Sequence, residues 1–377
     1  MHILIAPNAF KNSLTAREAA EAIKKGLKQS KLDCTCECFP IADGGDGTAD
    51  LIIDKFKGRR IVKKVYNPLG KHIDASFGLI DEGRTAVIEM ANASGLRLIS
   101  KKKMDPLFAT SFGTGQLISY ALNEGVSKII IGLGGSATVD GGEGLLRALG
   151  VCFTYKQNEK LSEQIEGMAM LIEIDLSGLD PRVKECEIIV LCDVENRMLG
   201  KKGAATVFGP QKGASPKDVI ILEETLSMLR RIALKETGKD MGKVKHGGAA
   251  GGAAAGLFAF LDAKLVPGAD YFLKLTGFEE SLKKADLVIT GEGSLDEQTL
   301  EGKGPFAVAQ LAQKYNIDVI GLAGKVPEKE NKALRKYFDV LLAIGNEPTE
   351  LADAMQLTKV NLIRTAKEVG NLIALKK

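Results

Sequence analysis

Residues 132–144 read Gly132-Leu133-Gly134-Gly135-Ser136-Ala137-Thr138-Val139-Asp140-Gly141-Gly142-Glu143-Gly144. The β-branched run Ile129-Ile130-Ile131 precedes this loop, and a helical pattern over 145–150 follows it. A strand, a glycine-rich turn and a helix in this order are typical of an anion site. Glycine lets the backbone approach a ligand closely, and the first turn of a helix has unpaired N–H groups that favour phosphate.

The loop matches neither of the two standard phosphate motifs. The chain contains no GxxxxGK[ST], which excludes a P-loop, and Ala137 stands where GxGxxG requires its third glycine. We therefore expect phosphate to be bound by a different arrangement. The alternative is an ordinary turn, but six glycines around a serine and a threonine exceed what one turn requires.

Strand and helix patterns alternate at both ends of the chain. Strands are predicted at 2–6, 34–41, 286–290, 318–322 and 339–344, and helices lie between them, the first opened by a Thr15–Glu18 capping box. This alternation predicts a doubly wound, Rossmann or flavodoxin-like parallel sheet built from 1–62 and 284–377. Residues 63–283 are predicted to form a large inserted mixed α/β domain, with a β-hairpin around 81–84. We expect the active site in the cleft between the two domains.

Composition and charge exclude several classes of protein. A net charge of +3 over 377 residues gives no electrostatic footprint for nucleic acid. No run reaches the 18 or so apolar residues of a membrane helix, and the N-terminus lacks the pattern of a signal peptide. A cytoplasmic location is therefore expected. Three of the six cysteines, Cys34, Cys36 and Cys38, alternate on a predicted strand and are expected to be reduced thiols on a buried strand face rather than metal ligands.

Carboxylates follow several of the predicted strands. Asp43 follows the second strand, Asp193 follows the run 188–192, and Glu292 and Asp296 follow 286–290. In doubly wound sheets the carboxyl ends of the strands face the ligand. Carboxylates there suit Mg²⁺ or a general base for a substrate hydroxyl. For any one of them, a simple role in a turn is the alternative.

Lysines also lie in predicted turns, where cations could neutralise phosphate. Lys11 follows the first strand, and Lys212 and Lys303 lie in glycine-containing segments. Lys11 is the favoured ligand of a substrate carboxylate or phosphate, with Arg84 and Lys303 as alternatives. The joint occurrence of a glycine loop, strand-end carboxylates and loop lysines is more specific than any single member.

Together these segments resemble the glycerate kinase family of the bacterial type (type I), over nearly the whole chain. The matching pieces are Phe10-Lys11, 42–45, 89–91 with 93–96, 109–115, 132–138, 192–194, 207–214, and 290–293 with Asp296 and Gln298. The chain has Asn8-Ala9-Phe10-Lys11-Asn12 where the family usually has Asp-Ser-Phe-Lys-Gly, so Asn8 removes a carboxylate. The resemblance implies ATP- and Mg²⁺-dependent phosphorylation of D-glycerate, with 2-phosphoglycerate favoured as the product.

The predicted roles follow from this combination. Asp193 and Lys11 are the predicted catalytic residues, with Asp193 as general base, and Glu292 and Asp296 are predicted to hold Mg²⁺. Predicted contacts to substrate or phosphate are Asp43, Gly134, Gly135, Ser136, Thr138, Lys212 and Lys303. Two other functions stay open: an NAD-dependent oxidoreductase acting on a small hydroxy acid, and a non-catalytic protein that binds a phosphometabolite.

Overall fold

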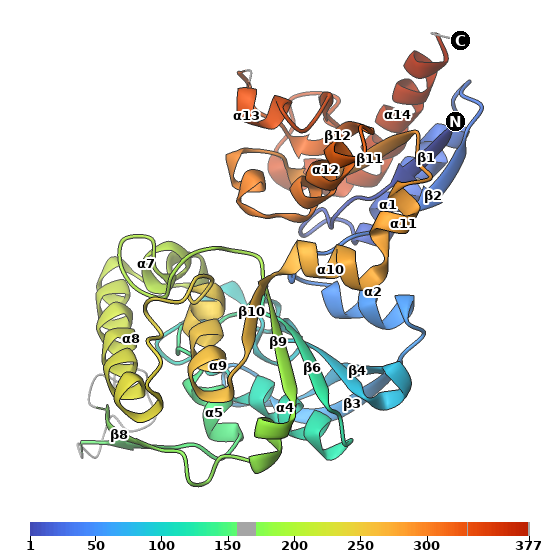
Figure 1. Cartoon of the computed structure of the whole chain (residues 1–377). Coiled ribbons are helices and arrows are strands. Elements are labelled where there is room, and N and C mark those ends of the chain that lie inside the picture. The colour runs from blue at the N-terminus through green and yellow to red at the C-terminus, as the bar shows by residue number, and fades with distance from the viewer. Residues whose placement is uncertain (157–170, 330, 376–377) are drawn as a thin grey trace. The chain divides into compact units, whose positions relative to one another are not determined.

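The structure of the protein is a computed structural model that describes residues 1–156, 171–329 and 331–375, with the side chains of Gln298 and Glu301 also outside the description. The chain divides into two compact units (Figure 1). Unit 1 comprises Met1–Asp43 and Gly268–Lys377, and unit 2 comprises Gly44–Pro267. Within the described residues, no helix is long and apolar enough to cross a membrane.

Unit 1 is built around a five-stranded parallel sheet. Its strands lie in the order β2-β1-β11-β12-β13. Numbered by their order within the unit, this is 2-1-3-4-5, the flavodoxin-like order of a doubly wound sheet. The strands are β1 (His2–Ile5), β2 (Thr35–Cys38), β11 (Leu287–Ser294), β12 (Asp318–Lys325) and β13 (Val340–Ala343). The predicted fold class is confirmed for this unit.

Both faces of the central strands β1, β11 and β12 are buried, as is typical of a parallel sheet, whereas the edge strands β2 and β13 are partly exposed. Ile3 and Ile5 point into a core shared with α1 and α14, whereas Leu4, which is equally buried, belongs to the opposite face. Helix α12 packs on β11 and β12. The helices of the unit are α1 (Ala16–Lys28), α10 (Gly268–Thr276), α11 (Phe278–Leu282), α12 (Gly304–Lys314), α13 (Lys332–Arg335) and α14 (Leu351–Ala374), with a 3-10 turn η7 (Glu297–Glu301).

The start of α1 shows how local sequence sets an element. The Thr15 side chain accepts from the Glu18 amide, and the Glu18 carboxylate accepts from the Thr15 amide, so the predicted capping box is confirmed. The alternating cysteines Cys34, Cys36 and Cys38 are free and pack against the core of unit 1, but they are half-buried, not buried as predicted, because β2 is an edge strand of the sheet.

Unit 2 contains a six-stranded mixed sheet in the order β10-β9-β6-β5-β4-β3. The pairs β3–β4 and β4–β5 are antiparallel, and β5, β6, β9 and β10 run parallel to one another. The strands are β3 (Arg59–Tyr66), β4 (His72–Ile80), β5 (Thr85–Glu89), β6 (Lys128–Gly132), β9 (Glu187–Cys192) and β10 (Lys264–Pro267), and a separate hairpin joins β7 (Cys152–Tyr155) to β8 (Leu171–Asp175). The predicted hairpin around 81–84 is the β4–β5 pair.

The helices of unit 2 are α2 (Thr48–Lys55), α3 (Ala91–Ser94), α4 (Phe112–Asn123), α5 (Glu143–Ala148), α7 (Ala204–Phe208), α8 (Pro216–Thr237) and α9 (Ala253–Leu261). Helices α4, α5, α8 and α9 pack with one face of this sheet in a large core cluster, to which Ile52 and Ile53 of α2 do not belong. Short 3-10 turns lie at 81–83, 96–98, 101–103, 181–185, 210–212 and 249–252.

The unit boundaries differ from the predicted ones at 62/63 and 283/284. Helix α2 packs on β4 and β5 and therefore belongs to unit 2, although it follows a strand of unit 1 in the sequence. Helix α10 packs on α12 and therefore belongs to unit 1. These contacts join residues that are distant along the chain, so local periodicity cannot reveal them.

Candidate functional site

The predicted site residues fall into two groups, one in each unit. Unit 1 holds Lys11, Asp43, Glu292, Asp296 and Lys303, and unit 2 holds Gly134, Gly135, Ser136, Thr138, Asp193 and Lys212. We call the first group, together with Asn8, the carboxylate cluster. We call the second group, together with Asp140, the lysine cluster.

The carboxylate cluster forms where the topology of unit 1 reverses. In the order 2-1-3-4-5 the switch point lies between the first and third strands, here β1 and β11, and ligands bind at the carboxyl ends there. Asn8 follows β1, Asp43 follows β2, and Glu292 lies near the end of β11. The side-chain amide of Asn8 donates to Asp43 Oδ2 at 2.8 Å, and the Gly304 amide at the start of α12 lies 3.5 Å from the same oxygen.

Glu292 is the most perturbed carboxyl group of this cluster. Its side chain is buried, and burial raises its pKa to about 8. The ammonium of Lys303, with Nζ 4.0 Å from Oε1, opposes this rise, whereas the charges of Asp43 and Asp296 add to it. Thr299 Oγ1 donates to Glu292 Oε1 at 3.3 Å. A buried carboxyl with like charges around it is typical of a functional site.

Asp296 and Glu292 fit a hydrated cation better than an all-protein metal cage. In the described part of the chain, no three His, Cys, Asp or Glu side chains are arranged to hold a metal ion. Mg²⁺, however, usually takes one or two carboxylates and keeps water and phosphate oxygens as its other ligands. The negative charges of Asp43 and Asp296 repel that of Glu292, and a cation bound among the three carboxylates would reduce this repulsion.

Lys11 lies on the exposed turn after β1. Its backbone nitrogen is 3.8 Å from the position that a Cβ on Gly293 would take, so the residue lies beside the end of β11. The backbone thus places Lys11 at the same sheet edge as Glu292.

In unit 2, the glycine-rich loop joins β6 to α5 as predicted, but the first turn of α5 is already occupied. Asp140 accepts hydrogen bonds from the amides of Gly142 and Gly144 at 3.1 and 3.3 Å. It also accepts from the amide and hydroxyl of Ser111 at 2.8 and 2.6 Å. The expected unpaired N–H groups at this helix are therefore not available to phosphate, because a carboxylate of the chain itself binds them.

The glycines of the loop are required for close backbone packing. A Cβ on Gly134 would collide with the Cα of Gly45, and the Gly134 amide donates to Gly44 O at 2.9 Å. Gly135 has φ +72°, and a Cβ there would lie 2.5 Å from Asp46 Oδ1. The second glycine tract packs on the same loop, where Gly251 abuts the carbonyl of Thr138.

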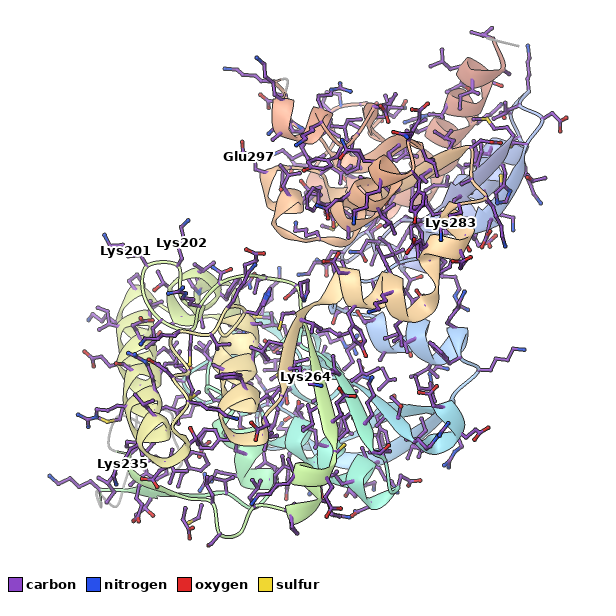
Figure 2. All side chains as sticks on the ribbon, viewed as in Figure 1. Lys201, Lys202, Lys235, Lys264, Lys283 and Glu297 are labelled. Atoms are coloured by element: carbon purple, nitrogen blue, oxygen red, sulfur yellow. The ribbon has the colours of Figure 1, made fainter. Side chains whose placement is uncertain are left out.

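Lys212 is the buried centre of the lysine cluster. Its ammonium donates to Ser136 Oγ at 2.9 Å and to the carbonyl of Thr138 at 2.7 Å, and the residue is only 3% exposed. Burial lowers its pKa to about 8, and the charges of Asp140 and Asp193 oppose that shift. The outward-pointing Lys201 and Lys202 show the ordinary solvated arrangement (Figure 2).

Thr138 carries an unusual hydroxyl. The residue is fully buried, and its Oγ1 has no hydrogen-bond partner among the described residues. Leaving a buried hydroxyl unpaired costs about 1–3 kcal/mol. Such a group is a candidate ligand contact.

Asp193 directly follows β9 and is half-buried. The segment after it is fixed by His246, whose Nδ1 is 2.7 Å from the carbonyl of Val194. Glu195, the other carboxylate after this strand, forms an ion pair with Lys245 at 2.7 Å. Asp193 is therefore held by a short, tethered segment.

Glu89 has no predicted role, although it is the last residue of the buried strand β5. Its side chain accepts from the amides of Gly47 and Ala49 at 3.0 and 3.2 Å and lies 3.7 Å from Arg97. Burial raises its pKa to about 7. The rule that selected Asp193 and Glu292, a carboxylate at a strand end, also selects Glu89, but Glu89 fixes the start of α2. Asp140, Ser111 and His246 were also missed, because their partners lie far away in the sequence.

A separate cavity of about 380 Å³, which we call the β12 pocket, opens at the end of β12 in unit 1. It is lined by Val326, Pro327, Glu328, Lys329, Asn331, Arg335 and Leu341. Its volume lies within the range of small-molecule sites.

The buried ammonium of Lys212 predicts a pH-dependent stability. Because the folded pKa lies below the ordinary value, the unfolded state binds more protons between about pH 8 and 10.5, so stability rises with pH there. The free energy of unfolding of the wild type relative to Lys212→Met should increase by about 1 kcal/mol per pH unit in this window. Urea unfolding at pH 7.5–10 measures it. Lys202→Met, an exposed control, should show no such trend, and a flat Lys212→Met difference would contradict the burial of a charge.

Comparisons with known proteins match the whole chain. The sequence model of the Glycerate kinase family matches residues 3–374. A glycerate kinase of Halalkalibacterium halodurans is 43% identical over 98% of this chain and 97% of its own length. A glycerate 2-kinase of Escherichia coli K12 is 41% identical over 100% of this chain and 98% of its own.

A solved structure agrees with the sequence comparisons. The crystal structure of a Salmonella typhimurium LT2 protein assigned as glycerate kinase 2 superposes with a TM-score of 0.82 at 40% identity, covering 100% of this chain and 99% of that one. The matches include every residue of both clusters, and they confirm the resemblance inferred from the motifs. The chain belongs to the glycerate kinase family.

Proposed function

We propose that the protein phosphorylates D-glycerate with ATP and Mg²⁺ and forms 2-phosphoglycerate. The observation that carries this proposal is the family match over residues 3–374, which spans both clusters. The product follows the name of the Escherichia coli relative, glycerate 2-kinase. No observation favours an oxidoreductase or a non-catalytic binding protein.

In the proposed reaction, Asp193 accepts the proton of the substrate hydroxyl as its oxygen attacks the γ-phosphorus. The new O–P bond forms while the bond from the γ-phosphorus to the bridging oxygen breaks, and ADP leaves. A carboxylate suits this role because it can accept a proton at neutral pH when it is ionised. The position of Asp193 at the end of β9, on a segment tethered by His246, supports this assignment.

We propose that the carboxylate cluster binds the cation that neutralises the negative charge of the phosphates. Glu292 and Asp296 would hold Mg²⁺, which neutralises phosphate oxygens and orients them when it is bound. Lys303 lies close enough to Glu292 to share this charge, and Lys11 lies at the same sheet edge. Asp43 accepts a hydrogen bond from Asn8, and its carboxylate lies beside the Gly304 amide at the start of α12. We propose that Asp43 contacts the ligands at this position.

The lysine cluster is proposed to contact the substrate or its phosphate through Gly134, Gly135, Ser136 and Thr138. Lys212 is too buried to do so freely, and its two hydrogen bonds end on Ser136 and Thr138. We therefore propose Lys212 as the positioning residue that fixes this part of the loop. The unpaired Thr138 hydroxyl is the contact that the structure supports best. The predicted location of the whole site between the two domains stays a prediction.

The direct test of the function incubates purified protein with ATP, Mg²⁺ and D-glycerate. We expect ADP release that depends on glycerate, and a phosphorus NMR spectrum that identifies 2-phosphoglycerate. ADP release no faster than in the blank without glycerate would reject the kinase activity. The 3-phosphate as product would reject only the acceptor position.

Two isosteric variants separate the proposed base from the proposed metal ligand. Asp193→Asn should lower kcat by at least about 100-fold, the usual worth of a general base, with no change in the Mg²⁺ concentration for half-maximal rate. Asp296→Asn should raise that Mg²⁺ concentration. Initial rates over a Mg²⁺ series measure both. The opposite pattern would exchange the two assignments.

The Thr138 hydroxyl gives a test with two opposite readouts. Thr138→Val removes a buried hydroxyl without a partner, so the ligand-free protein should gain about 1 kcal/mol in its free energy of unfolding. The same change should raise the KM of one substrate about tenfold, since a hydrogen bond to a charged ligand is lost. Urea unfolding and steady-state kinetics measure the two effects. The control Thr138→Ser keeps the hydroxyl and should retain the parental KM. A stabilised variant with both KM values unchanged would show that the hydroxyl contacts no ligand.

A further inference from the structure

The turn 44–47 of unit 2 holds the beginning of the glycine-rich loop. The Gly134 amide donates to the Gly44 carbonyl at 2.9 Å. Asp46 lies against the next residue of the loop, because its Oδ1 is 2.5 Å from the position that a Cβ on Gly135 would take. The position of this turn therefore sets the position of the loop residues that contact it.

The chain that follows α3 holds the next residues of the loop. The Leu96 amide donates to the Gly135 carbonyl at 2.9 Å. The Ala137 amide donates to the Ser94 carbonyl, also at 2.9 Å. These two bonds lie on either side of Ser136 in the sequence, so the backbone of this serine is fixed by the segment after α3.

One carboxylate, that of Glu89, contacts both of these segments. Its Oε2 accepts hydrogen bonds from the amides of Gly47 and Ala49 at 3.0 and 3.2 Å, which fixes the turn. Its Oε1 lies 3.7 Å from Nη2 of Arg97, in the segment after α3. Glu89 also pairs with Gly132, the first residue of the loop, in the register of β5 and β6. Its two oxygens thus face the two segments that hold the loop.

Arg97 completes the connection between the two segments. Its Nη1 lies 3.9 Å from Asp46 Oδ1 in the turn, and its Nη2 donates to the side-chain oxygen of Asn92. The Glu89 side chain is only 3% exposed, and a buried carboxylate requires donors or an opposite charge. Two amides of one segment and the guanidinium of the other meet this requirement, so Glu89 stabilises one particular arrangement of both.

We infer that Glu89 is a positioning residue of the kinase, which together with Arg97 fixes the two segments and so places Ser136 and Thr138 for contact with a substrate. This inference rests on the proposed function and adds to it a buried residue that acts through the loop. A purely structural role would lower the amount of active protein, and hence kcat, without a change in KM. A positioning role changes KM, because the contacts of the loop with its ligand are weakened.

A double-mutant cycle on the pair of Glu89 and Arg97 tests this inference, with steady-state kinetics against ATP and against D-glycerate. Glu89→Gln keeps an oxygen for the two amides and removes the charge that faces Arg97, and Arg97→Met removes the partner. Each variant should raise the KM of at least one substrate about tenfold, with kcat within about twofold of the wild type. The double variant should be no worse than either single variant, because all three lack the same interaction.

The matched control is Arg60→Met, which removes the exposed ion pairs of Arg60 with Asp50 and Asp54 of α2. It should leave both KM values unchanged. Effects that multiply in the double variant of Glu89 and Arg97 would overturn the inference, since they would show that one of these side chains acts on the substrate independently of the other. Unchanged KM values, or a loss of kcat alone, would also overturn it.

Amide hydrogen exchange of the ligand-free protein provides a second measurement that requires no activity. In both single variants, peptides that cover 132–140 should exchange at least about tenfold faster than in the wild type, because the acceptors of the Gly134 and Ala137 amides are held less firmly. Peptides of α14, in unit 1, should not change. Unchanged exchange in the loop would overturn the inference while leaving the kinase function intact. A wild-type protein that never phosphorylates glycerate would reject the function, and faster loop exchange in the variants would still keep Glu89 as the residue that fixes the loop.

Discussion

The buried ammonium of Lys212 is the constraint on which unit 2 depends. An unpaired charge cannot be buried, so the surrounding chain must supply acceptors and counter-charges. Ser136 Oγ and the Thr138 carbonyl supply the acceptors, and Asp140 and Asp193 supply the opposing charge. This single group thus ties the loop after β6 to the segment after β9. Removing it would take away a positive charge that faces Asp140, and Asp140 also fixes Ser111 and the first turn of α5.

The glycine-rich loop has a different physical role from the one that its composition suggested. Its glycines allow backbone to pack on backbone, against Gly44-Gly45 on one side and against the second glycine tract on another. The helix that follows is capped from within the protein by Asp140. The part that remains suited to a ligand is therefore short and centres on Ser136 and the unpaired hydroxyl of Thr138. A loop whose backbone is packed on both sides can hold these two hydroxyls in fixed positions, which is what binding a small substrate requires.

In unit 1, the order of the strands, and not a tightly packed loop, brings the candidate site residues together. The order 2-1-3-4-5 brings the ends of β1 and β11 together at the switch point, and residues from four separate segments meet there. Burial and the charges of Asp43 and Asp296 raise the pKa of Glu292 to about 8. Asn8 is notable here, because it donates to Asp43 where a second carboxylate would repel it. Asn8, which replaces the usual aspartate of the family motif, therefore has a defined hydrogen-bond partner in Asp43.

By itself, the sequence determined the local features: the strands, the capping box at Thr15, the β4–β5 hairpin, the doubly wound class and the family. These follow from periodicity, turn chemistry and motif order, which act over a few residues. Only the tertiary structure decided that α2 belongs to unit 2, that Asp140 occupies the start of α5, and that Lys212 is buried. Each of these depends on contacts between segments far apart in the chain, and the burial that shifts the pKa of Lys212 or Glu292 exists only after those segments pack together.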